Sequence, residues 1–144
     1  MKKIFVFLVV TLIWTACGNS KESSETTVPI ALLQDGVEVL SFHSKQRCPT
    51  CIAIENETRN LLNSSFSQQL ADSTVVFRVF DLSEKENQQI AEHYQVSFSS
   101  LILVKYDAGK PTVCDLTEYA FSKARVAPDE FKAELAGRLE ALLQ

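Results

Sequence analysis

Two cysteines separated by two residues are the part of this sequence best suited to chemistry. They form the run Cys48-Pro49-Thr50-Cys51, which follows an alternating apolar segment and opens a segment with helical periodicity. This spacing brings both sulfurs within disulfide reach across one helical turn, and a helix N-terminus lowers the pKa of the first thiol because its dipole favours the thiolate. The pattern predicts a redox-active dithiol, with Cys48 as the nucleophile and Cys51 as the resolving thiol.

A single Cys-x-x-Cys motif has two further interpretations. Structural zinc usually takes four Cys or His ligands, often from two such motifs, and this sequence has only one. The other candidate ligands are His43, His93 and Cys114. A metal-binding module would hold Cu(I) or zinc through Cys48 and Cys51, with His43 as a further ligand. A binding domain in which the two cysteines form a static disulfide is the third possibility.

The N-terminus predicts where the protein resides. Lys2 and Lys3 precede a short apolar run that ends just before Cys17. The run is too short to span a bilayer permanently, and a small residue directly before a cysteine resembles the cleavage motif of bacterial lipoproteins. Residues 1–16 are therefore expected to be a lipoprotein signal peptide, and Cys17 is expected to be lipidated. Trp14 departs from that motif, which leaves an ordinary secretory signal as the alternative.

Composition divides the remainder into a tether and one domain. Residues 17–27 are polar and predict a flexible tether, whereas residues 28–144 suffice for one compact domain. Removing Lys2 and Lys3 reduces the 14 basic side chains to 12 against 18 acidic ones, a formal charge of about −6. This charge argues against nucleic acid and lipid headgroups as partners, so the lipid anchor would hold the protein at the membrane.

Apolar periodicity predicts an α/β domain. Strands are expected at residues 37–42, 75–82, 100–106 and 111–116. Helices are expected at residues 49–63, after a cap at Ser83 and from residue 128 onward, with a short helical turn at residues 117–125. The first helix has one apolar face, made of Cys51, Ile54, Thr58, Leu61 and Leu62. Strand-helix-strand units require parallel pairing and the last two strands form a hairpin, which together predict a mixed four-stranded sheet flanked by helices.

With these elements in place, the chain resembles the thioredoxin fold over residues 37–144, and the bacterial lipoprotein branch of thioredoxin-like proteins in particular. In that family the Cys-x-x-Cys motif lies on the first turn of the helix after the central strand, with the first cysteine exposed and the second shielded. Cys48 and Cys51 match those positions. The resemblance implies a thiol-disulfide oxidoreductase without a cofactor, acting on protein or small-molecule disulfides and thiols. Together with the signal peptide, it implies a lipid-anchored protein of the bacterial cell envelope, on the periplasmic side.

Three positions depart from the pattern of that family. Ser99 or Ser100 stands where the family has a cis-proline, so a trans peptide bond is expected here. Loss of that proline accompanies metal binding in the family, which supports the metal alternative. Arg47 replaces a tryptophan, and its charge either favours a thiolate on the next residue or is an ordinary solvated loop charge. Ser41 or Phe42 lies near the place of the family's buried acid.

The expected site has a reacting pair and a set of neighbours. The reacting pair is Cys48 and Cys51, and the neighbours expected to bind substrate or act electrostatically are Arg47, Pro49, Thr50 and Ser99. His43 is expected to be hydrogen-bonded locally at a strand end, with a proton shuttle or metal ligand as the alternatives. Cys114 is expected to be a buried apolar thiol.

Overall fold

The structure is a computed structural model, and it describes residues 33–144. The predicted signal peptide at residues 1–16, the tether at residues 17–27 and the lipidated Cys17 lie outside the described residues. These three remain predictions. Among the helices of residues 33–144, none combines the length and the apolar character needed to cross a lipid bilayer.

The described part of the chain follows the predicted order of strands and helices. The strands are β1 (Gly36–His43), β2 (Val75–Asp81), β3 (Ser100–Asp107) and β4 (Lys110–Asp115). The helices are α1 (Pro49–Ser65), α2 (Ser67–Ala71), α3 (Gln88–His93), α4 (Thr117–Lys123) and α5 (Pro128–Leu143), with a 3-10 helix at Lys85–Asn87. The short helix α2, which continues the chain after α1, was not predicted.

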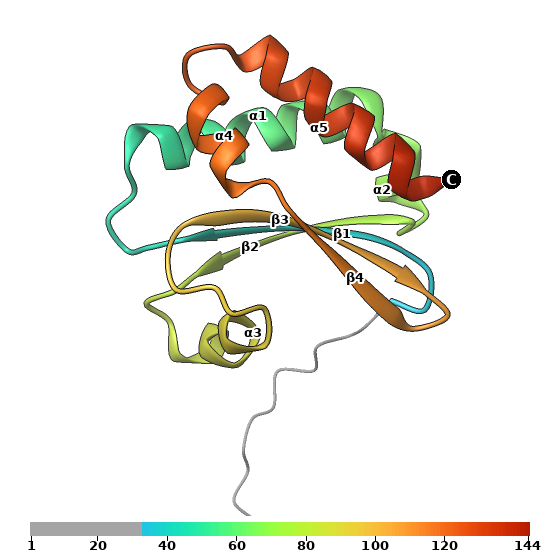
Figure 1. The fold of residues 1–144 in the computed structure, drawn as a ribbon, viewed down its shortest axis with the longest axis horizontal. Coiled ribbons are helices and arrows are strands. Elements are labelled where there is room, and N and C mark those ends of the chain that lie inside the picture. Colours follow the sequence, from blue (N-terminus) through green and yellow to red (C-terminus); the bar gives the residue numbers. More distant parts are fainter. Residues whose placement is uncertain (1–32) are drawn as a thin grey trace, which may run out of the picture.

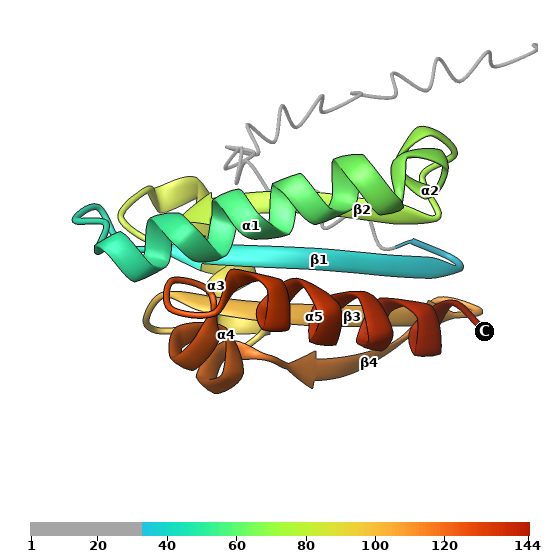
Figure 2. The same cartoon turned by 90° about the horizontal axis from the view of Figure 1, so that it is seen from above.

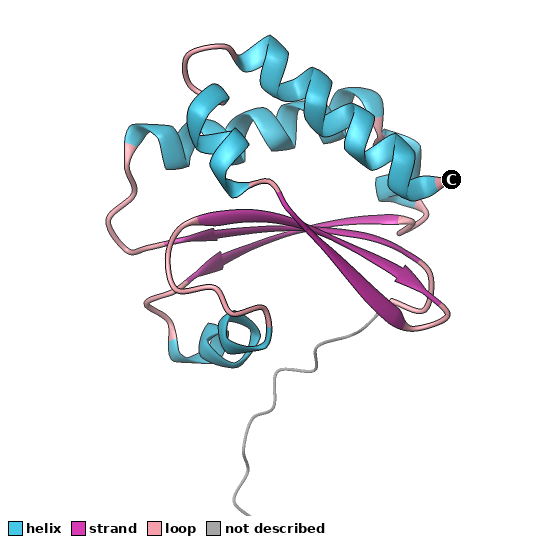
Figure 3. Cartoon of the chain, in the orientation of Figure 1, coloured by secondary structure: helices cyan, strands magenta, loops and turns pink. Residues whose placement is uncertain are grey.

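The strands form one mixed sheet in the order β2-β1-β3-β4 (Figures 1 and 3). Strand β1 pairs in parallel with β2 and antiparallel with β3, and β3 pairs antiparallel with β4. The parallel pair is joined through α1 and α2, while β3 and β4 form a hairpin. The predicted mixed four-stranded sheet flanked by helices is confirmed.

Helices cover both faces of this sheet. Helices α1, α2, α4 and α5 lie over one face and α3 lies on the other (Figure 1), and α1 and α5 run side by side, roughly along the direction of the strands (Figure 2). In the central strand, Val37 and Val39 belong to the core cluster beneath α1 and α5, whereas Leu40 and Phe42 belong to the cluster beneath α3. Successive side chains of a strand point to opposite faces, so a strand covered on both sides is apolar almost throughout.

Helix α1 positions the cysteine pair. Its buried residues are Cys51, Ile54, Thr58, Leu61 and Leu62, the same five that helical periodicity predicted. Pro49 occupies the first turn, where its missing N–H breaks no helical hydrogen bond. The second cysteine is therefore fixed in the core by the same face that packs the helix onto the sheet.

The predicted helix capped by Ser83 was wrong at its start. The Ser83 amide and hydroxyl both donate to Asp81 Oδ1, at 2.8 and 2.7 Å, so Ser83 closes a turn at the end of β2 instead of capping a helix. Short polar side chains compete with the helix for local backbone groups in this way. Helical structure begins with the 3-10 helix at Lys85–Asn87 and continues as α3.

Replacement of Gly36 and of Gly137 by alanine is expected to change the free energy of unfolding in opposite directions. Gly36 has a φ of 124°, and a Cβ there would lie 2.6 Å from the Thr74 carbonyl oxygen. We expect Gly36→Ala to lower the free energy of unfolding by about 1 to 3 kcal/mol through strain and this clash. Gly137, inside α5, has open space around its Cβ position. Gly137→Ala should raise the free energy of unfolding by about 0.5 to 1 kcal/mol. Urea denaturation measures both values, and effects of the same sign would contradict this account.

Candidate redox site

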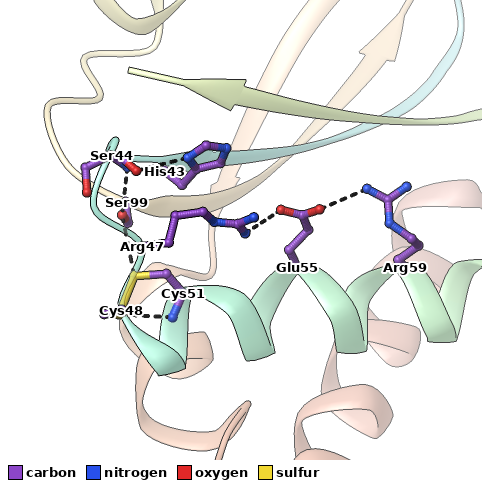
Figure 4. A network of polar contacts seen from close by, with 8 residues as sticks. All are labelled: His43, Ser44, Arg47, Cys48, Cys51, Glu55, Arg59 and Ser99. Carbon is purple, nitrogen blue, oxygen red and sulfur yellow. Dashed lines mark hydrogen bonds and ion pairs between the residues drawn. A yellow bond between two sulfur atoms is a disulfide. The ribbon is translucent and has the colours of Figure 1, made fainter. Parts of the chain in front are cut away.

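Cys48 and Cys51 form a disulfide at the N-terminus of α1, just beyond the end of the central strand (Figure 4). Their Cα atoms are 5.1 Å apart. Cys48 is the N-cap residue, and its Sγ accepts a hydrogen bond from the Cys51 amide at 3.0 Å. The helix dipole and the free amide groups of the first turn favour negative charge at this position. The first sulfur thus lies where a thiolate is stabilised.

The two cysteines differ in exposure. Cys48 is half-buried, whereas Cys51 is only 8% exposed and packs among the buried residues of α1. A substrate sulfur can therefore reach Cys48 more readily than Cys51. The resemblance implies an exposed first cysteine and a shielded second one, and in the structure the first is half-buried and the second is buried.

Ser99 lies against the second cysteine. Its Oγ is 3.7 Å from Cys51 Sγ and accepts a hydrogen bond from the Ser44 amide at 3.4 Å. A disulfide sulfur carries no hydrogen, so in this state the Ser99 hydroxyl is the only possible donor of the contact with sulfur. All peptide bonds of residues 33–144 are trans, as expected where serine replaces the proline. Ser99 is thus the expected neighbour with a direct contact to the pair.

The side chain of Arg47 points along α1 toward Glu55 (Figure 4). Its Nη2 lies 2.5 Å from Glu55 Oε2, while Arg59 Nη2 lies 3.0 Å from Glu55 Oε1. Burial of the Glu55 carboxyl raises its pKa, but hydrogen bonding from Arg59 and the charge of Arg47 outweigh this effect and hold the pKa below its usual value. In the disulfide state the Arg47 guanidinium is thus paired with Glu55, and its effect on a Cys48 thiolate stays a prediction.

The other predicted neighbours lie around the pair. Pro49 is exposed and Thr50 is half-buried, both in the first turn of α1 between the cysteines. His43 ends β1, and its Nδ1 lies 3.1 Å from the Ser44 carbonyl oxygen, which makes it a locally bonded histidine. Cys114 is half-buried and packs against the core cluster beneath α1 and α5.

A metal centre would need more ligands than this site gathers. Within residues 33–144, no three His, Cys, Asp or Glu side chains lie close enough together to hold a metal ion. His43 therefore does not join Cys48 and Cys51 in a three-ligand set. After reduction the pair would offer two thiolates to a soft metal, two fewer than structural zinc usually takes.

A buried carboxylate that the sequence did not predict lies on the other face of the sheet. Glu38 is 1% exposed, and its Oε2 accepts a hydrogen bond from the Tyr106 hydroxyl at 3.0 Å. Arg78 lies 3.6 Å from its other oxygen, and Tyr94 of the α3 region bonds Tyr106 at 2.8 Å. Through Tyr106 these bonds connect the α3 region to the sheet. Glu38 precedes Phe42 by four residues, roughly 13 Å along a strand, so it lies away from the disulfide at the end of that strand.

The place of the thioredoxin family's buried acid holds no acid here. Ser41 is 4% exposed and has the same strand parity as Val39, so it faces the side of α1. Glu38 alternates with Ser41 along the strand and faces the opposite side of the sheet, beneath α3. The polar side chain in contact with Cys51 Sγ is the Ser99 hydroxyl.

Comparison with known proteins gives matches among solved structures. A thioredoxin from Thermus thermophilus is 18% identical with a TM-score of 0.46, over 77% of this chain and 82% of that one. A Fasciola hepatica thioredoxin is 17% identical with a TM-score of 0.41, over 62% and 77%. An uncharacterised thioredoxin-like protein from Clostridium perfringens is 13% identical with a TM-score of 0.42, over 69% and 78%. No protein-family model and no curated protein matches the chain.

The chain's own topology settles its architecture. The sheet order β2-β1-β3-β4 combines a parallel pair joined through a helix with a terminal hairpin. The cysteine pair occupies the N-terminus of the helix that follows the central strand. With this order of elements and this position of its Cys-x-x-Cys motif, the chain has a thioredoxin-like fold.

Proposed function

We propose that this protein is a membrane-anchored thiol-disulfide oxidoreductase of the bacterial cell envelope, acting on protein or small-molecule disulfides. One observation carries the chemical part of the proposal. A disulfide joins the N-cap Cys48, which solvent reaches, to Cys51, which is buried behind it. This arrangement separates the sulfur that meets substrate from the sulfur that resolves the intermediate.

The reducing direction begins with both cysteines reduced. The Cys48 thiolate, stabilised by the α1 N-terminus, attacks one sulfur of a substrate disulfide and releases the other as a thiolate. Cys51 then gives its proton to solvent and attacks Cys48 Sγ in the mixed disulfide. This step expels the remaining substrate thiolate and forms the Cys48–Cys51 bond. Two electrons pass to the substrate, whose two thiolates take up protons from solvent according to their pKa values.

Ser99 contributes to the second step. Its hydroxyl lies beside Cys51 Sγ and can donate a hydrogen bond to the developing Cys51 thiolate. In the oxidising direction Cys51 is the leaving group when a substrate thiolate attacks Cys48, and the same donor favours its departure. The Ser99–Cys51 contact therefore assists both reduction and oxidation of substrate, because a Cys51 thiolate forms in each direction.

The chemical proposal is tested by turnover of an aromatic disulfide with dithiothreitol as the reductant and the full-length chain in detergent. We expect the protein to accelerate the reaction and Cys48→Ser to abolish the acceleration. The matched control is Cys114→Ser, which removes a thiol that packs away from the pair and should leave turnover unchanged. Equal rates for wild type and Cys48→Ser would refute the proposed chemistry.

The proposed location is supported by the sequence features of residues 1–27. An apolar leader ends directly before Cys17, a polar tether follows, and the acidic formal charge of the mature chain argues against lipid headgroups as binding partners. Two or more acyl chains give stable anchoring. We expect radiolabelled fatty acid to be incorporated into the wild type in bacterial cells and to be lost in Cys17→Ala, which should leave the membrane fraction. Unchanged labelling and fractionation of Cys17→Ala would refute lipidation at this residue.

A further inference from the structure

Glu55 lies between two arginines, one turn of α1 after Cys51. Each carboxylate oxygen has one cationic partner, Arg47 on Oε2 at 2.5 Å and Arg59 on Oε1 at 3.0 Å. The Glu55 side chain is only 13% exposed, and the Arg59 guanidinium is further held over the Phe77 ring at 5.0 Å from its centroid. The result is a fixed anion at the side of the redox pair (Figure 4).

Arg47 connects this carboxylate to the redox pair. Arg47 directly precedes Cys48 in the chain, and its guanidinium is bound to Glu55 while Cys48 is in the disulfide and carries no charge. Reduction of the pair creates a thiolate on Cys48. The same guanidinium then has two anionic acceptors, the Glu55 carboxylate and the Cys48 thiolate, and these two compete for it.

We propose that Glu55 is a positioning residue of the redox pair, which holds Arg47 away from Cys48 and thereby makes the pair less oxidising than Arg47 would otherwise make it. This inference rests on the proposed redox function and adds a determinant of the reduction potential. Glu55 touches neither the substrate nor the reacting sulfurs, and it acts through Arg47.

The direction of the effect follows from the balanced exchange with glutathione. Glutathione disulfide and the reduced pair react to give two molecules of glutathione and the Cys48–Cys51 disulfide, with two electrons passing to glutathione. A cation beside the Cys48 thiolate stabilises the reduced pair and raises its reduction potential. Glu55 withholds part of that stabilisation, because Arg47 must leave a shielded carboxylate to reach the sulfur.

The expected size is modest because both arginines are partly exposed. Coupling between partly exposed charges corresponds to factors of up to about five in an equilibrium constant. Glu55→Gln should therefore shift the exchange equilibrium about fivefold toward the reduced pair, which corresponds to an increase of about 20 mV in reduction potential. Glutamine keeps the shape of the side chain and an oxygen acceptor while removing the charge.

The test is the glutathione equilibrium of the full-length chain in four forms: wild type, Glu55→Gln, Arg47→Gln and the double variant. We expect the shift caused by Glu55→Gln to shrink to less than twofold when Arg47 is already glutamine. The matched control is Glu57→Gln, which removes a carboxylate from the same helix where the partner is Lys132 at 3.7 Å. Its equilibrium should stay within twofold of wild type.

Two results would overturn the inference. An unchanged equilibrium in Glu55→Gln would show that the carboxylate does not influence the pair. A shift of the same size with and without Arg47 would show that Glu55 acts through its own charge and does not position Arg47. Thermal unfolding of each variant checks that the fold is retained. If wild type itself fails to equilibrate with glutathione, the proposed function fails instead, so the two failures are distinguishable.

Discussion

Cys51→Ser is expected to accumulate mixed disulfides with envelope proteins, whereas Cys48→Ser is not. In Cys51→Ser the solvent-accessible Cys48 still attacks a substrate disulfide, but the buried thiol that would resolve the intermediate is gone. In Cys48→Ser the remaining thiol of the pair, Cys51, is 8% exposed and meets few substrates. Non-reducing electrophoresis after acid quenching of bacterial cells measures the adducts, and mass spectrometry identifies the cysteine that carries them.

The controls for this experiment are built into the chain. The double variant Cys48→Ser/Cys51→Ser should form no adducts, which shows that the two remaining cysteines, Cys17 and Cys114, do not contribute. Cys114→Ser combined with Cys51→Ser should trap as strongly as Cys51→Ser alone. Equal trapping by the two single variants would contradict the assignment of Cys48 as nucleophile and Cys51 as resolving thiol.

Phe131→Ala is expected to lower the free energy of unfolding by about 3 to 5 kcal/mol. Phe131 is 1% exposed in α5 and belongs to the core cluster that also contains Ile54 and Leu61 of α1. Its truncation leaves a cavity where α5 packs near α1 and the sheet. Because stabilities of single domains are commonly 5 to 15 kcal/mol, this loss is a large share of the total. Urea denaturation followed by circular dichroism measures it.

Phe98→Ala provides the comparison for Phe131→Ala. Phe98 is 64% exposed, so the same change of side chain should alter the free energy of unfolding by no more than about 0.5 kcal/mol. Comparable losses for the two variants would contradict the placement of Phe131 in the core. Because both variants remove the same phenyl ring, the difference between their free energies of unfolding reports the effect of burial alone.

Periodicity predicted most of the fold because each regular element repeats its apolar pattern at a fixed spacing. The buried face of α1 from Cys51 to Leu62 shows this, as do the strands on either side of that helix. The turn at residues 107–110 was also predicted, and Ala108 and Gly109 there have φ of 49° and 75°, as a tight hairpin turn requires. The predicted helix start at Ser83 was wrong, because the Ser83 amide and hydroxyl donate to the Asp81 carboxylate and do not cap a helix.

The candidate site was only partly predictable, since its reacting residues are close in sequence and some of its partners are not. Cys48 and Cys51 are defined by their spacing alone. The Glu55–Arg59 pair could have been read from its i,i+4 spacing. The Arg47–Glu55 pair depends on the path of the loop before α1, and the Glu38–Tyr106 bond joins residues on different strands. Pairing between distant segments has no signature in a single sequence.

The most direct test of a redox function is the equilibrium of the Cys48–Cys51 pair against graded ratios of reduced and oxidised glutathione, on the full-length chain with its metal content measured. We predict a reversible two-electron transition in metal-free protein, with a potential between those of thioredoxin, about −270 mV, and of strongly oxidising dithiol proteins, about −120 mV. A pair that stays oxidised until the protein unfolds, or a reduced pair that carries one stoichiometric metal ion, would contradict the account.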